Sequence, residues 1–169
     1  FVKPNDSGSS FGVTKVKTKD ELPAAIETAL KESDEVMIEA FMDGREVACG
    51  VVRVKGKAIV LPVTEIISRN EFFDYEAKYT PGKSDEVTPA DMPEEITNEI
   101  QDLSSRVYDL LGCKGIVRVD FIIVQGKPYF LEINTVPGMT EESLIPKQVK
   151  AAGIELAELY SMVIEDLFI

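Results

Sequence analysis

The apolar positions along the chain repeat with a helical period in four segments. The first segment predicts a helix that begins after Asp20 as its N-cap and ends near Ser33. Its apolar positions recur at spacings of three and four: Leu22, Ala25, Ile26, Ala29 and Leu30. The second helix stops at Gly112, and its apolar face consists of Ile96, Ile100, Leu103, Val107, Leu110 and Leu111. Two further helical patterns occupy residues 144–151 and 155–168.

Short apolar runs bounded by turn formers predict β-strands between these helices. They occupy residues 1–3, 13–16, 36–42, 47–54, 57–67, 116–124 and 128–134. Lys55-Gly56 lies between two of these runs, and Gln125-Gly126 lies between the last two. Because short turns with a glycine join antiparallel neighbours, we expect two hairpins within a sheet.

Two segments show neither the helical repeat nor the apolar runs of strands. NDSGSSFG, residues 5–12, is too polar and glycine-rich to pack as a helix or strand and is predicted to be a loop. Residues 68–93 contain the aromatic group FFDYEAKY without a sustained pattern. A stretch of that length favours a functional loop over a mere connection.

Composition narrows the classes of partner. With 30 acidic against 18 basic residues the net charge is −12, which disfavours nucleic acid and anionic membrane surfaces. No apolar run approaches the roughly 20 residues of a membrane span. Cys49 and Cys113 are isolated, and no signal peptide opens the sequence, so we expect a cytoplasmic protein with a small ligand or a protein partner. The chain contains no His, which excludes His-type zinc sites and Ser-His or Cys-His pairs within it.

Polar residues interrupt the last two apolar strands. Arg118 and Asp120 share a face of one strand, and Glu132 and Asn134 share a face of the next. If Val124 lies opposite Pro128, Asp120 faces Glu132 and Arg118 faces Asn134. Two facing carboxylates repel, and a hard divalent cation such as Mg²⁺ removes that conflict. The alternative is that these are surface charges on a solvated face of the sheet.

A second candidate site lies at the start of the chain. Lys3 ends a strand, and the following loop carries Gly8, Ser9, Ser10 and Gly12. Backbone N–H groups of such a loop can surround a phosphate while the lysine supplies a charge, although the segment does not match the P-loop pattern. An ordinary polar loop is the alternative interpretation.

Several motifs together resemble a known family. VKPNDSGSSFGVTKV, VMIEAFMDGREV, FFDYEAKYTPG, LGCKGIVRVDF and LEINTVPGMTEESLIP occur in the order and approximate spacing found in ATP-grasp enzymes, and are most similar to the D-alanine–D-alanine ligases. The resemblance spans nearly the whole chain. Its most specific parts are YEAKY and NTVPGMTEESLIP, because other ATP-grasp enzymes share the Asp/Glu/Asn set.

The resemblance implies an α+β fold of the ATP-grasp type, with antiparallel sheets, flanking helices and ATP between two subdomains. Residues 1–42 would be the remainder of the smaller subdomain, and residues 43–169 the larger one with a lid loop at 70–83. The chain begins on FVKP without an initiator Met, and we expect a fragment that lacks the family's N-terminal domain.

The resemblance also implies a reaction and its residues. One D-alanine would attack the γ-phosphate of ATP to form an acylphosphate, and the amine of a second D-alanine would displace phosphate, giving D-alanyl-D-alanine for peptidoglycan. Two Mg²⁺ ions, or Mn²⁺, would assist. By position, the resemblance assigns the nucleotide to residues near the start of the chain: Lys3 would contact the phosphates, Ser9 would close over the site, Glu39, Phe41 and Met42 would line the adenine pocket, and Glu46 would reach the ribose.

The resemblance assigns the other roles to later residues. Lys78 and Tyr79 would belong to the lid, and Asp120, Glu132 and Asn134 would bind metal. Arg118 and the Gly138 N–H would stabilise the tetrahedral intermediate, and Ser143 and Leu144 would receive the second D-alanine.

Three hypotheses compete: a D-alanine–D-alanine ligase fragment, an ATP-grasp ligase for another carboxylate and amine, and a non-catalytic metal-binding or structural domain. Tyr79 in YEAKY argues against the second, since relatives that form a D-lactate ester carry a His in this loop. Lys3 and its loop argue against the third, which has no need of them. For Phe41 and Met42 the alternative is ordinary core packing, and for Lys78 and Tyr79 a solvated loop tip. The full-length enzyme is expected to be a homodimer.

Overall fold

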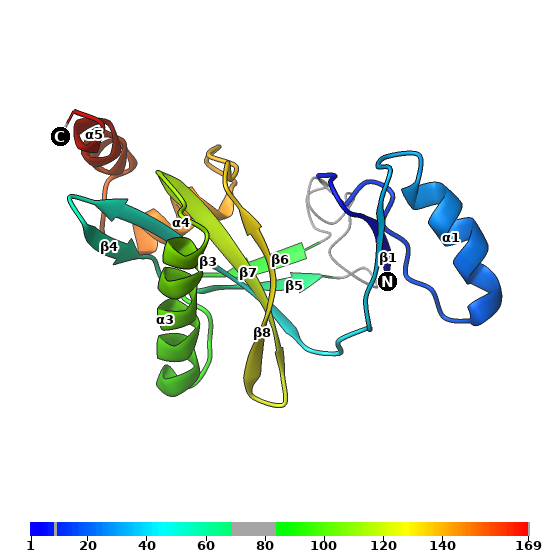
Figure 1. Cartoon of the computed structure of the whole chain (residues 1–169). Helices are drawn as coiled ribbons and strands as arrows, with labels where there is room; N and C mark the ends of the chain where they lie inside the picture. The colour runs from blue at the N-terminus through cyan, green and yellow to red at the C-terminus, as the bar shows by residue number, and fades with distance from the viewer. Residues whose placement is uncertain (9, 69–83, 169) are drawn as a thin grey trace. The chain divides into compact units, whose positions relative to one another are not determined.

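The computed structural model describes residues 1–8, 10–68 and 84–168 and divides the chain into two compact units (Figure 1). One unit comprises residues 1–43 with 68–85, and the other comprises residues 44–67 with 86–169. Each unit has a core of its own. Among the described residues, no helix is long and apolar enough to cross a membrane.

The first unit pairs two short strands and covers them with a helix. Strands β1 (Val2–Pro4) and β2 (Val36–Ile38) are antiparallel, with Lys3 opposite Met37. A 3-10 turn, η1 (Lys19–Glu21), leads into α1 (Leu22–Ala29), which buries Ala25 and Ala29 against Val2.

Three expectations for this unit are wrong. Asp20 is not an N-cap but lies inside η1, because the Glu21 carboxylate accepts hydrogen bonds from the Lys17 N–H and the Thr18 hydroxyl and holds a preceding turn. Residues 13–16 form only an isolated bridge, Val2 to Thr14, and β2 ends at Ile38.

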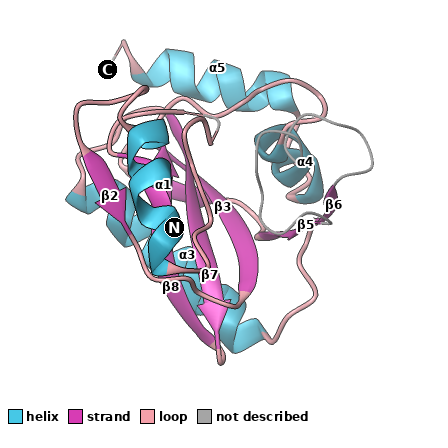
Figure 2. Ribbon diagram, turned by 90° about the vertical axis from the view of Figure 1, so that its right-hand side faces the viewer, coloured by secondary structure: helices cyan, strands magenta, loops and turns pink. Residues whose placement is uncertain are grey.

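The second unit is built on a six-stranded sheet in the order β6-β5-β3-β7-β8, with β4 also paired to β3 (Figure 2). The strands are β3 (Arg45–Val54), β4 (Lys57–Val60), β5 (Thr64–Ser68), β6 (Ser84–Val87), β7 (Ile116–Val124) and β8 (Lys127–Asn134). Strand β3 is antiparallel to β4, β5 and β7, and β7 is antiparallel to β8. The predicted α+β architecture with antiparallel sheets and flanking helices is confirmed.

Both predicted hairpins are present. Val54 pairs with Lys57 and Val124 with Lys127, so Lys55-Gly56 and Gln125-Gly126 are two-residue turns. All four turn residues have positive φ, between 51° and 77°, the geometry that lets a two-residue turn follow the strand twist. The expected strand 57–67 is in fact two strands, because the chain leaves β3 at Leu61-Pro62-Val63 and proline has no N–H to continue the ladder.

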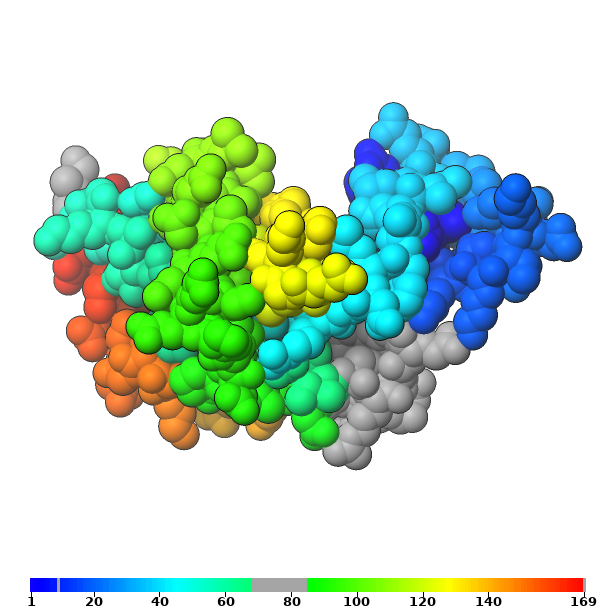
Figure 3. Space-filling model, turned by 90° about the horizontal axis from the view of Figure 1, so that it is seen from below, coloured from blue at the N-terminus to red at the C-terminus, as the bar shows by residue number. Residues whose placement is uncertain are grey.

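Helices cover both faces of this sheet. Helix α3 (Glu94–Leu110) packs its apolar stripe on the face formed by Val47, Cys49, Val51, Val117 and Val119. Helices α4 (Leu144–Ala151) and α5 (Leu156–Asp166) pack around Val52 and Leu61 on the opposite side. Figure 1 shows α3 and α4 on the two sides of the strands, and in Figure 3 α3 (green) lies beside the tip of the β7–β8 hairpin (yellow). On this second face, α4 and α5 pack at the end of the sheet that carries Val52 and Ile116, and the polar residues Arg118 and Asp120 follow Ile116 on the same face of β7.

Candidate active site

The polar face of the second unit is formed by β7 and β8. Asp120 lies opposite Glu132 and Arg118 opposite Asn134, as the sequence predicts. The assumed pairing of Val124 with Pro128 is wrong by one residue, since Pro128 lies opposite Ile123. A β-bulge corrects the offset: Phe121 pairs with Phe130 and Asp120 with Glu132, which leaves Leu131 as the extra residue. Bulges of this kind re-aim side chains next to functional sites.

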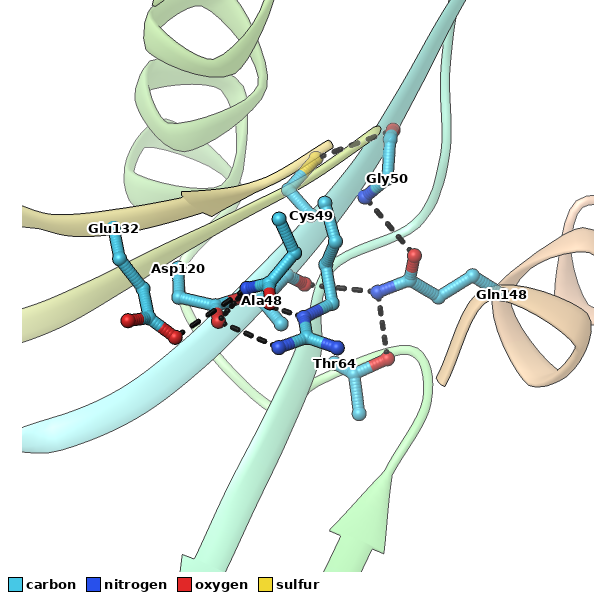
Figure 4. Close-up of polar contacts among 9 residues, drawn as sticks. Ala48, Cys49, Gly50, Thr64, Asp120, Glu132 and Gln148 are labelled. Carbon is cyan, nitrogen blue, oxygen red and sulfur yellow. Dashed lines mark hydrogen bonds and ion pairs between the residues drawn. The ribbon is translucent and has the colours of Figure 1, made fainter. Parts of the chain in front are cut away.

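Asp120 is the most tightly held member of the group. It is 4% exposed, and its two carboxylate oxygens accept hydrogen bonds from Arg118 Nε at 2.7 Å and Arg118 Nη2 at 2.8 Å. The Asn134 amide donates to Asp120 Oδ2 at 3.0 Å and to Glu132 Oε1 at 3.4 Å. Figure 4 shows the carboxylates of Asp120 and Glu132 turned toward each other across the two strands. Glu132, unlike Asp120, is exposed to solvent.

Arg118 is a cation among several carboxylates. Burial alone would lower the pKa of Arg118, but its hydrogen bonds with Asp120 and the charges of Asp120, Glu132 and Glu46 outweigh burial and hold that pKa above its ordinary value. Arg118 is therefore a permanent cation. The carboxylates of Asp120, Glu132 and Glu46 are the charges that raise its pKa. A divalent cation would bind favourably among these carboxylates.

The donor set fits Mg²⁺. Two carboxylates and a carboxamide supply the hard oxygen ligands that this ion prefers, with room for water and phosphate in the rest of the shell. The Asn134 amide now turns its N–H groups to the carboxylates, so binding through its oxygen requires the amide to rotate. The described residues contain no group of three or more His, Cys, Asp or Glu that could hold a metal ion.

The loop after β8 brings two other predicted residues together. A Cβ added at Gly138 would lie 2.8 Å from Ser143 Oγ, so the Gly138 backbone and the Ser143 hydroxyl are adjacent. The Ser143 Oγ also lies 3.2 Å from the Thr140 N–H, and Ser143 immediately precedes α4. Leu144, the next residue, is buried.

The nucleotide residues predicted in the first unit also lie near one another. Lys3 Nζ is 2.7 Å from Glu39 Oε2, across β1 and the end of β2. Phe41 is 53% exposed and Met42 is also exposed, so neither is a core residue. Lys15 Nζ lies 4.1 Å from the centre of the Phe41 ring. Glu46 belongs to the second unit, while Ser9, Lys78, Tyr79 and the whole of the predicted lid 70–83 lie outside the described residues.

Of the buried polar residues that were not predicted, one bonds directly to the central strand β3. Gln148 on α4 is fully buried and makes three hydrogen bonds to the sheet. A signal was present in the sequence, because Leu144, Ile145, Gln148 and Val149 share the helical spacing of a core face and a carboxamide there needs partners.

The chain is similar in structure to several solved ligases. The chain matches VanG D-Ala:D-Ser ligase from Enterococcus faecalis with a TM-score of 0.87 and 40% identity, over 98% of this chain and 48% of that one. It matches D-alanine–D-alanine ligase from Bacillus anthracis complexed with ATP with a TM-score of 0.79 and 36% identity, over 99% and 51%. The fold is that of an ATP-grasp domain.

Sequence relatives narrow the class further. The chain is 54% identical to the D-alanine–D-alanine ligase of Phocaeicola vulgatus, over 99% of this chain and 52% of that protein, and 56% identical to that of Flavobacterium johnsoniae, over 98% and 51%. The family model described as "D-ala D-ala ligase C-terminus" matches residues 1–165, and the chain belongs to this family. It spans about half the length of the curated relatives it matches.

Proposed function

We propose that the full-length protein containing this chain is an ATP-dependent ligase that joins two D-alanine molecules for peptidoglycan synthesis in the cytoplasm. The observation that carries the proposal is the sheet face on which Arg118 is bonded to the buried Asp120 opposite Glu132, within a chain of this family. In this proposal residues 1–42 are the remainder of the smaller ATP-grasp subdomain and residues 43–169 are the larger one.

The protein acts by placing charge around a reaction of its substrates. A D-alanine carboxylate attacks the γ-phosphate of ATP, ADP leaves, and the amine of the second D-alanine then attacks the acylphosphate carbonyl, releasing phosphate and a proton. Such phosphoryl transfer needs little covalent chemistry from side chains. In this proposal Arg118 and the Gly138 N–H stabilise the oxyanion of the tetrahedral intermediate, and Ser143 and Leu144 bind the second D-alanine.

The remaining roles concern the nucleotide and metal. Lys3 contacts the phosphates, Glu39, Phe41 and Met42 line the adenine pocket, and Glu46 binds the ribose. Asp120, Glu132 and Asn134 would hold two Mg²⁺ ions, with Mn²⁺ as a substitute, and these ions would neutralise charge on the phosphates. Ser9, Lys78 and Tyr79 are assigned to closure over the site. The full-length enzyme is proposed to be a homodimer.

The direct test is phosphate release by the full-length protein with ATP, Mg²⁺ and a panel of D- and L-amino acids. We expect turnover with D-alanine alone. D-Alanine with D-serine is assayed separately, because the chain is similar to the solved structure of an E. faecalis D-Ala:D-Ser ligase. Turnover that needs D-alanine together with D-serine would change the second substrate, and no turnover with any D-amino acid would refute the proposal.

Calorimetry tests the metal assignment separately. We expect Mg²⁺ to bind the full-length protein weakly alone and more tightly with a non-hydrolysable ATP analogue, because phosphate oxygens complete its shell. Tight binding without nucleotide would contradict this assignment, and the variant Asp120→Asn should lose the nucleotide-dependent binding.

A further inference from the structure

Gln148 fills a break in the hydrogen bonding of the sheet. Along the edge of β3 that faces away from β7, β5 pairs with β3 as far as Ala48, and β4 pairs with β3 from Val51 onward. At this break the Gln148 carboxamide takes the place of a strand: its Nε2 donates to the Ala48 carbonyl at 2.9 Å, and its Oε1 accepts from the Gly50 N–H at 3.0 Å. Figure 4 shows the side chain reaching from α4 to both residues.

The same carboxamide also reaches β5. Its Nε2 donates to Thr64 Oγ1 at 3.0 Å, and that hydroxyl lies 2.7 Å from Thr88 Oγ1. Gly50 has no room for a side chain, because a Cβ there would lie 2.7 Å from Gln148 Oε1. The polar groups around this carboxamide are satisfied, since no buried side-chain nitrogen or oxygen in the described part of the chain lacks a partner.

The break lies directly beside the candidate active site. Ala48 is the register partner of Asp120, and Gly50 is the register partner of Arg118. Gln148 therefore bonds to β3 at the two residues that lie opposite the buried ion pair of β7.

Gln148 lies on the helix whose N-terminal end carries the proposed acceptor residues Ser143 and Leu144. Leu144 and Gln148 are four residues apart on α4, so they lie on the same face of the helix about one turn apart. Both are buried, and Ser143 is the residue before the helix. Apolar contacts of Ile145 and Val149 hold α4 on the sheet, but they allow sliding that a set of three directional hydrogen bonds does not.

We propose that Gln148 is a positioning residue, which sets the place of Ser143 and Leu144 relative to Arg118 and Asp120. It touches no substrate. This inference rests on the proposed function, since it assumes that Ser143 and Leu144 bind the attacking amine. Its consequence is specific: loss of the carboxamide misplaces the acceptor, whereas ATP and the first D-alanine still react.

The test compares Gln148→Met with Gln101→Met in the full-length enzyme. Met keeps the length of the side chain and removes its hydrogen bonds. Gln101 is a matched control, because its carboxamide also bonds to this part of the sheet, donating to the Leu61 carbonyl at 3.1 Å, but from α3. The measured quantities are the KM for each D-alanine, the KM for ATP, and the ratio of phosphate released to dipeptide formed.

For Gln148→Met we expect the KM of the second D-alanine to rise about tenfold, because small displacements of a reactant are costly. The other two KM values should stay within about twofold of wild type. The ratio of phosphate to dipeptide should exceed one, as water takes the place of the misplaced amine. Gln101→Met should leave the KM values and the ratio unchanged.

Other outcomes overturn the inference. If all rates of Gln148→Met fall in proportion to the amount of folded enzyme, and the ratio of phosphate to dipeptide stays at one, then Gln148 contributes to stability alone. If Gln148→Met does not fold, Thr64→Val decides: it removes one of the three bonds, and an unchanged acceptor KM there rejects the positioning role. Absence of D-alanine-dependent turnover in the wild type instead refutes the proposed function, which separates the two failures.

Discussion

Two carboxylates that face each other across β7 and β8 lie in different environments. Asp120 is buried and bonded twice to Arg118, while Glu132 is exposed and only weakly bonded to Asn134. Asp120 and Glu132 can therefore both bind metal and still differ in how much they stabilise the fold. Replacing each carboxylate by its amide separates the effect on stability from the effect on metal binding.

Asp120→Asn should lower the free energy of unfolding by about 2 kcal/mol, because it removes the charged carboxylate that accepts two hydrogen bonds from the half-buried Arg118. Glu132→Gln should change it by less than about 0.5 kcal/mol, as exposed positions usually do. Both variants should lower kcat/KM by about a hundredfold or more if the two residues bind metal. Urea unfolding and phosphate release of the full-length variants measure the two effects, and equal losses of stability would contradict the asymmetry.

Cys49 provides a pH-dependent prediction. Burial raises the pKa of its thiol from 9.0 to about 12, against a smaller opposing effect of Ser104. Below pH 9 the thiol is protonated in both the folded and unfolded chain and has no effect on stability. Between pH 9 and 12 the unfolded chain releases a proton that the folded chain retains, so stability falls as pH rises.

The measurement is iodoacetamide labelling of the folded protein at pH 8, followed by peptide mass spectrometry. Cys113, which is half-buried, should react, and Cys49 should react only after unfolding. The variant Cys49→Ala should show a shallower loss of stability between pH 9 and 12. Rapid labelling of Cys49 under native conditions would count against the assigned burial.

The sequence predicted the site at the residue scale better than it predicted the packing around it. Arg118, Asp120, Glu132 and Asn134 could be found because strand alternation is a local property. Gln148 could be flagged only as a polar residue on an apolar helix face, because its partners lie in a break between β4 and β5. That break depends on tertiary structure.

At the scale of elements, the hairpins were predictable and their exact registers were not. Glycine after Lys55 and after Gln125 marks both turns, and β7 and α4 have the expected limits. The bulge at Leu131 leaves no signal in the pattern, since Phe130, Leu131 and Ile133 would fit either register. Helix α1 was placed less well, because the Glu21 carboxylate competes for the role expected of Asp20.

The Gln125 turn can be strengthened. Gln125 has a φ of 51°, a conformation that asparagine adopts more readily than glutamine. Gln125→Asn should therefore raise the free energy of unfolding by about 0.5 kcal/mol, and Gly126→Ala, at a φ of 77°, should lower it by about 1 kcal/mol. Denaturant titration of the full-length protein measures both, with kcat as the control that should not change. A destabilised Gln125→Asn would show that its side chain has a role beyond the turn.

At the scale of the whole molecule, the chain holds most residues assigned to ATP and metal but spans about half of its relatives. Catalysis requires both reactants in near-attack geometry, and about half the length of the relatives lies outside the region that this chain matches. We expect the 169-residue chain alone to show no detectable ligase activity. Phosphate release measured beside the full-length enzyme tests this. Turnover by the isolated chain within about tenfold of the full-length enzyme, roughly 1.4 kcal/mol in barrier, would contradict this division of the work.

The extra residue at Leu131 also fixes a rule of parity for the β7–β8 hairpin. A two-residue turn pairs positions whose residue numbers differ by an odd number, as those of Val124 and Lys127 do. The residue numbers of Asp120 and Glu132 differ by an even number. The facing carboxylates therefore require one unpaired residue somewhere between them. A relative whose turn is one residue longer needs no bulge, and a relative with the short turn must keep one. Insertions and deletions in this hairpin should accordingly occur as compensating pairs, one at the turn and one in the strand, wherever the two carboxylates still face each other.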